Sequence, residues 1–140
     1  MRVLDGLRDW LNSKSGVQMV ADDPKMAAEV LLLLRVMFAD GSMNEKELEL
    51  FKQMCTSLFG IEADDVPEVV KFLTDTSYET NSEQAANVFR DMPVKRKNEL
   101  LRNLLRMAIV DESFHDNEKD MIARIARTLG YSEEKIRSLI

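Results

Sequence analysis

The sequence is short of the residues that carry most catalytic and redox chemistry. It contains one cysteine and one histidine, so it can form neither an internal disulfide nor a Cys/His metal cluster. It has no glycine-rich phosphate loop and no nucleophile paired with a histidine base. The cysteine, Cys55, lies on an apolar helical stripe with no His or Lys directly beside it to activate the thiol. We therefore predict a protein that is not an enzyme, and an unpaired cysteine suits a reducing cytoplasm.

An excess of positive charge and long apolar runs are also missing. The formal net charge is −6 and the isoelectric point is near 4.9, which argues against a surface that binds nucleic-acid phosphates. The longest apolar run, Val30 to Leu34, is much too short to span a bilayer. We expect a cytoplasmic protein with no transmembrane segment and no nucleic-acid partner. Peripheral attachment to the inner face of the membrane is the alternative.

Glycine and proline are scarce, with 5 and 3 residues, whereas 45% of the chain is hydrophobic and 31% is charged. Apolar residues recur at helical spacing, which predicts an all-α fold of about seven helices. A chain of 140 residues is long enough to bury its own core as one domain.

A repeat with an offset of 71 positions organises the chain. Residues 33–47 and 104–118 are identical at 6 of 15 positions. In both copies a Glu follows an Asp by 7 positions. Each copy consists of an apolar helix, an acidic turn and a second amphipathic helix. The repeat predicts two pseudo-symmetric helix-turn-helix hairpins packed around two buried central helices.

The repeat also predicts how the chain is divided. Residues 1–23 are expected to form an N-terminal amphipathic helix and linker, with Gly16 ending the helical pattern. This helix either packs on the main body or anchors the chain to a membrane surface or a partner helix. Residues 24–140 form the helical domain, with the following expected parts: repeat one 24–60, connector helices 61–93, repeat two 94–130 and a C-terminal helix 131–140.

The turn carboxylates are the candidate functional residues. Asp40 and Glu47 flank the first turn, and Asp111 and Glu118 flank the second. Oxygen-only ligands favour hard cations, so Ca²⁺ or Mg²⁺ is expected ahead of Zn²⁺. An EF-hand is excluded because Phe38 stands where that loop needs an oxygen ligand.

Helix capping is the alternative explanation for the two glutamates. Asn44 followed by Glu47, and His115 followed by Glu118, match the spacing of a capping box. An aspartate at a helix C-terminus meets the unfavourable end of the dipole, so capping does not explain Asp40 or Asp111. The repeated Arg35 and Arg106 either pair with turn carboxylates or lie on a solvated helix face.

The duplicated hairpin, with Ala39-Asp40-Gly41-Ser42-Met43 at its first turn, resembles the TerB-like tellurite-resistance family over about residues 24 to 140. That family also includes the N-terminal domain of a membrane-anchored DnaJ-type co-chaperone. The resemblance implies an all-helical fold and places the family's candidate metal positions at Asp40, Glu47, Asp111 and Glu118. The second copy departs from the first at Glu112, which replaces the glycine. No His-Pro-Asp of a J-domain is present, so co-chaperone activity is not implied.

We expect a non-catalytic module of the response to tellurite or related stress, which binds a divalent cation or a cationic partner through its duplicated turns. The alternative is a protein–protein interaction scaffold for a membrane-associated partner, with no metal bound.

Overall fold

The computed structural model describes residues 15–39, 44–110 and 114–139, and all regular structure in these ranges is helical. The all-α fold class is therefore confirmed. The N-terminal helix expected before Gly16 lies outside the described residues, as do Asp40 and Asp111. The helices follow in this order: α2 (Gly16–Asp22), α3 (Pro24–Met37), α4 (Glu45–Phe59), the 3₁₀ helix η1 (Ala63–Asp65), α5 (Val66–Thr76), α6 (Ser82–Asn87), α7 (Val94–Ile109), α8 (Asp116–Thr128) and α9 (Glu133–Leu139).

Within the segment expected as an N-terminal helix and linker, residues 16–22 form helix α2. Gly16 begins α2 instead of ending a helix, because the Ser15 hydroxyl accepts a hydrogen bond from the Gln18 backbone at 3.2 Å and caps the new helix. A Cβ on Gly16 would lie 2.9 Å from Cβ of Asp65. Glycine at this position therefore permits α2 to pack closely against the start of α5.

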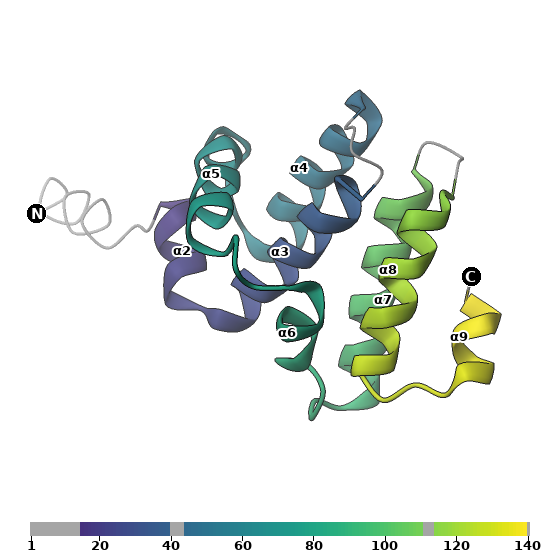
Figure 1. The fold of residues 1–140 in the computed structure, drawn as a ribbon. Coiled ribbons are helices and arrows are strands. Elements are labelled where there is room, and N and C mark those ends of the chain that lie inside the picture. Colours follow the sequence, from purple (N-terminus) through teal and green to yellow (C-terminus); the bar gives the residue numbers. More distant parts are fainter. Residues whose placement is uncertain (1–14, 40–43, 111–113, 140) are drawn as a thin grey trace, which may run out of the picture.

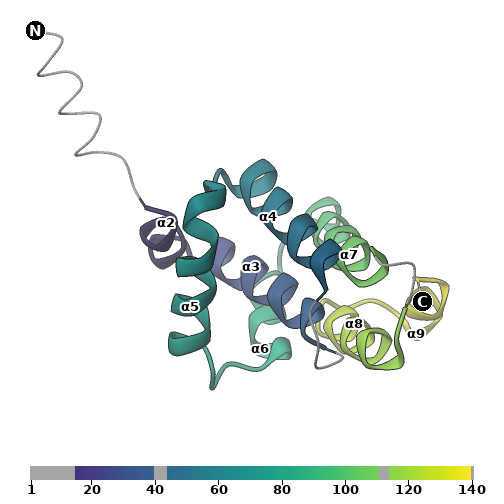
Figure 2. The same cartoon turned by 90° about the horizontal axis from the view of Figure 1, so that it is seen from above.

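Helix α3 is the centre of the fold. It packs against α2, α4, α5, α6, α7 and α8, and Figures 1 and 2 show it crossing the middle of the molecule, with α2 and α5 at one end and α9 at the other. Residues 28–34 are all buried, as expected for a buried central helix. The exception at its C-terminal end is Phe38, which is 44% exposed.

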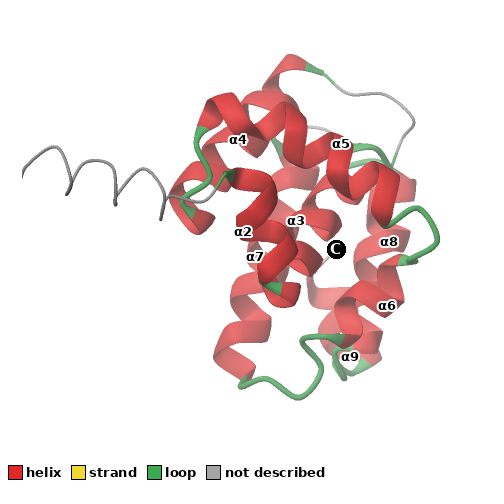
Figure 3. Ribbon diagram, turned by 90° about the vertical axis from the view of Figure 1, so that its left-hand side faces the viewer, coloured by secondary structure: helices red, strands yellow, loops and turns green. Residues whose placement is uncertain are grey.

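Helix α7, the second central helix, differs from α3 in being buried along one face only. Leu100, Leu104 and Met107 are fully buried, whereas Arg102 and Arg106 on the opposite face are exposed. Helices α7 and α8 form the second hairpin, which packs beside α3 (Figure 3). The two repeats therefore share a fold but bury different fractions of their first helix.

One buried ion pair joins the two repeats. Glu29 of α3 is 1% exposed and pairs with the Arg96 guanidinium of α7. That guanidinium also lies over the Phe89 ring, 5.4 Å from its centroid. The position of repeat two equivalent to Glu29 is Leu100, 71 residues later. Repeat one thus carries a buried carboxylate where repeat two carries a hydrocarbon.

The second helix of each repeat ends at a glycine with positive φ, 70° at Gly60 and 93° at Gly130. Glycine adopts this left-handed conformation without steric cost. The two glycines are 70 positions apart, since 130 − 60 = 70, whereas the offset of the repeat is 71. Repeat two therefore lacks one residue at the end of its second helix.

The missing residue changes which leucine is buried. Leu129 is fully buried, but Leu58, 71 positions earlier, is 44% exposed. When the two glycines are aligned, Leu129 corresponds to Phe59, which packs against the core. Because of this deletion, the residue of α4 that is equivalent to Leu129 is Phe59 and not Leu58.

The connector helices are close to the prediction, with shifted ends. Helix α5 continues to Thr76, although the turn was expected from Thr74. Asn81, not Ser82, caps α6, and its side chain accepts a hydrogen bond from the Gln84 backbone at 2.7 Å. Among the described residues no helix is long and apolar enough to cross a membrane.

Candidate cation site at the paired turns

Glu47 and Glu118 occupy equivalent places in the first turns of α4 and α8, and both are buried, with 3% and 2% exposure. The Glu47 backbone N–H donates to Oδ1 of Asn44 at 2.8 Å, and Nδ2 of Asn44 donates to Oε1 of Glu47 at 3.1 Å. In the second copy the His115 backbone N–H donates to Oε1 of Glu118 at 3.1 Å. Both glutamates therefore help to cap their helices, in agreement with the local sequence pattern.

The burial of these carboxylates is greater than a cap requires. A capping glutamate at a helix N-terminus commonly remains hydrated, and removing a carboxylate from water is costly unless further partners stabilise its charge. The two glutamates are buried at equivalent places in both repeats.

The residue that leads into each turn meets the second helix of the other repeat. Ala39, at the end of α3, lines a groove together with Asp120 and Met121 of α8. Val110, 71 residues after Ala39, lines a second groove together with Glu49 and Leu50 of α4. Asp120 and Met121 are the equivalents of Glu49 and Leu50 at the offset of 71, so the contacts of the two repeats are reciprocal.

The arrangement of the helices agrees with this reciprocity. In Figure 1 the end of α3 and the start of α4 lie at the same upper side of the molecule as the end of α7 and the start of α8. Asp40 follows Ala39 in the chain, and Asp111 follows Val110. The two aspartates themselves lie outside the described residues.

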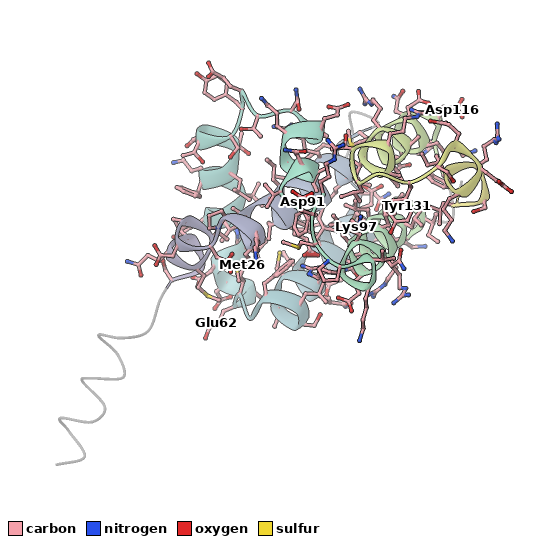
Figure 4. The ribbon with its side chains drawn as sticks, turned by 90° about the horizontal axis from the view of Figure 1, so that it is seen from below. Met26, Glu62, Asp91, Lys97, Asp116 and Tyr131 are labelled. Carbon is pink, nitrogen blue, oxygen red and sulfur yellow. The ribbon has the colours of Figure 1, made fainter. Side chains whose placement is uncertain are left out.

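Several further oxygen donors lie at the junction. Glu45 and Glu49 are exposed on the first turns of α4, and Asp116 and Asp120 are exposed on the first turns of α8. Figure 4 labels Asp116 at the edge of the molecule. Within residues 15–39, 44–110 and 114–139, no group of three or more His, Cys, Asp and Glu could hold a metal. A complete ligand set would therefore need Asp40 or Asp111.

The only histidine, His115, lies at the N-cap position of α8. This is the capping role expected from the sequence. The structure thus places His115 and Glu118 in the same hydrogen-bonded turn.

Arg35 and Arg106 have different surroundings despite their equivalence in the repeat. Nη2 of Arg35 donates to the backbone carbonyl of Ser77 at 2.9 Å, at the C-terminus of α5. Burial lowers the pKa of Arg35 from its ordinary value. The predicted pairing of Arg35 with a turn carboxylate is not observed among the described residues. Arg106 is exposed, as predicted for a solvated face.

Cys55 is buried in the core, and its burial raises the thiol pKa to about 12. At pH 8 only about one thiol in 10,000 would then be the reactive thiolate. We expect a chromogenic disulfide reagent at pH 8 to label the folded protein about a thousand times more slowly than the chain unfolded in urea. Labelling at similar rates in the two states would show that the thiol is accessible and activated.

These features define a class of protein, namely an all-α domain made of two repeat-related hairpins with acidic turns. A family model described as tellurite resistance protein TerB matches residues 26–139. The match covers nearly the whole chain, so the protein belongs to the TerB family. No curated protein and no solved structure matched the chain.

Proposed function

We propose that this member of the TerB family is a non-catalytic protein that binds a divalent cation at its paired turns during the response to tellurite or related stress. The observation that carries the proposal is the burial of Glu47 and Glu118 at equivalent positions, 3% and 2% exposed. Ca²⁺ or Mg²⁺ fits the oxygen ligands better than Zn²⁺ does. The cytoplasm is the proposed location.

The proposed site draws on both repeats. Each turn supplies one Asp and one Glu of the four candidate ligands, and a cation held by few protein ligands is bound weakly. The reciprocal contacts of Ala39 and Val110 support a site shared by the two repeats, because these residues directly precede Asp40 and Asp111 in the chain. A cation at the junction would therefore receive carboxylates from both hairpins.

Isothermal titration calorimetry with Ca²⁺, Mg²⁺ and Zn²⁺ tests the proposal. We expect measurable binding of Ca²⁺ or Mg²⁺, and an affinity lower by roughly 10-fold or more in Asp40→Asn/Asp111→Asn, because two ligands lose their charge. Asp64→Asn/Asp75→Asn is the matched control. These two aspartates are exposed on η1 and α5, and the double variant changes the net charge by the same amount.

Two results would reject the cation site. One is the absence of heat above the dilution background for all three ions. The other is an equal affinity in the turn variant and the control variant, which would indicate a general attraction of cations to an acidic protein.

A second candidate function is protein–protein interaction without a metal. Phe38 and Ile109, related by the offset of 71, are 44% and 49% exposed at the ends of α3 and α7. Large apolar side chains exposed at equivalent places favour a surface that binds a partner.

A further inference from the structure

A second pair of grooves, both mainly apolar, is also related by the repeat. The first lies between α3 and α5 and includes Arg35 and Phe38. The second includes Arg106 and Ile109 in the equivalent places. We call the second, which is bounded by α7 and α9, the α7–α9 groove. Its volume is about 420 Å³, within the usual range of ligand sites.

The α7–α9 groove has an apolar floor and a cationic rim. Leu101, Leu105 and Ile109 of α7 form the floor. Arg102, Arg106 and Lys135 stand along the rim, and all three are exposed. The groove thus presents positive charge on the surface of a protein whose net charge is −6.

The arginine shared by the two grooves has a partner in only one of them. In the α3–α5 groove, Arg35 donates to the carbonyl of Ser77. That carbonyl lies at the negative end of the α5 dipole. In the α7–α9 groove no described residue provides an equivalent acceptor for Arg106. The second groove therefore lacks the acceptor that the first receives from its own chain.

The rim cations also differ from other cations of the same region. Arg96 and Arg127 pair with Glu29 and Glu133, and in the latter pair Nε lies 2.6 Å from Oε1. No ion pair involves any of the three rim cations in the part of the chain that the structure describes. Their charges are available to an acidic group from outside.

The groove is elongated along α7. Residues 98, 101, 102, 105, 106 and 109 line it, and their spacing of three and four is one face of a helix. The 11 steps from residue 98 to residue 109 rise about 16.5 Å at 1.5 Å per residue. One end is fixed by the Tyr131 hydroxyl, which donates to Oδ1 of Asn98. Figure 4 labels Tyr131 close to Lys97, and Nζ of Lys97 lies 6.0 Å from the centre of the Tyr131 ring.

We propose that the α7–α9 groove binds an acidic amphipathic helix of a partner protein. The apolar side chains of that helix pack on Leu101, Leu105 and Ile109, and its carboxylates reach Arg102, Arg106 and Lys135. A helix of about three turns matches the length of the groove and a helix-in-groove mode of recognition. The proposal is independent of the cation site, because none of the turn residues lines this groove.

Fluorescence anisotropy with a labelled peptide of about four helical turns tests the proposal. The probe carries leucines at positions i, i+3, i+4 and i+7, with glutamates on both sides of this stripe. We expect it to bind the complete chain in buffer with EDTA, with an affinity that falls as salt is added. EDTA removes divalent cations, so peptide binding is measured without the proposed cation. The peptide experiment can therefore fail or succeed independently of the calorimetric test of the cation site.

The matched variants compare charge at two places. Arg102→Glu/Arg106→Glu should weaken peptide binding by roughly 10-fold or more, because it replaces attraction by repulsion. Lys71→Glu/Arg90→Glu gives the same change in net charge at exposed residues outside the groove and should retain most of the affinity. Ile109→Ser, at an exposed position, should weaken binding without lowering the melting temperature.

Several results would overturn the proposal. Equal losses in the two double-reversal variants would show general electrostatic attraction. If a peptide with lysine in place of every glutamate binds as tightly as the probe, the rim cations play no part in recognition. A third result is that the groove binds dodecanoate but not the peptide, and that Arg102→Glu/Arg106→Glu abolishes the binding of dodecanoate. This result would assign the groove to a small amphiphile. If sedimentation shows that the chain self-associates and so covers the groove, the groove would be assigned to a second copy of the chain.

Discussion

Replacement of Arg96 by alanine should lower the free energy of unfolding by about 3 kcal/mol. The change leaves the carboxylate of Glu29, 1% exposed, without the guanidinium that balances its charge. An unpaired buried charge costs more than the pair itself contributes. The Arg96 side chain is 35% exposed, so part of its charge is hydrated and the expected loss lies at the lower end of the range for buried pairs. Urea denaturation followed by circular dichroism measures the loss.

The second repeat provides the control for this prediction. Leu100 occupies the position equivalent to Glu29 and is fully buried. A hydrocarbon is therefore compatible with this place in the fold. We expect Arg96→Ala/Glu29→Leu to recover most of the stability lost in Arg96→Ala, since the buried charge is gone. If the double variant is as unstable as the single one, the loss comes from the packing of Arg96 on Phe89 and not from the carboxylate.

Alanine at Leu129 should cost about 3 kcal/mol, whereas alanine at Leu58 should cost less than about 0.5 kcal/mol. The two leucines are 71 positions apart in the repeat, but Leu129 is fully buried and Leu58 is 44% exposed. Truncation of a buried leucine removes apolar contacts and leaves a cavity, and truncation of an exposed one does neither. Chemical denaturation of the two variants under identical conditions gives the comparison.

Phe59 distinguishes the two ways of aligning the repeats. If the glycines align, Phe59→Ala should be the costlier change at the end of α4, because Phe59 packs against the core. If Leu58→Ala costs as much as Leu129→Ala, the offset of 71 persists to the end of the helix. The proposed one-residue deletion before Gly130 would then be wrong.

Much of the fold could be predicted because its signals are local. The apolar run of α3, the start at Asp23-Pro24 and the two glycines define helices without knowledge of distant contacts. Asp23 accepts hydrogen bonds from Lys25 and Met26, both at 3.1 Å, as its position before a proline suggests. The family assignment rests on the same local features, repeated twice.

The parts that could not be predicted depend on contacts between distant residues. The partner of Arg35 is Ser77, 42 positions away, and no pattern near Arg35 indicates a helix C-terminus. Gly16 resembles a helix terminator until its close approach to Asp65 is known. The capping of the glutamates could be read from the sequence, whereas their burial and the reciprocal grooves at the turns could not. The roles of Asp40 and Asp111 as ligands stay predictions.

The reciprocal contacts of Ala39 and Val110 bear on the stoichiometry of the proposed cation site. Ala39 shares a groove with the start of α8, and its counterpart Val110 shares one with the start of α4. Two identical subunits meet in the same way across a twofold axis, each presenting one patch to the other. The reciprocal contacts within the single chain have the same form, which is expected of an approximate internal twofold axis that relates its two hairpins. A cation bound on that axis would be shared by both hairpins, so a saturated titration would end at one ion per chain, whereas independent sites would take up two.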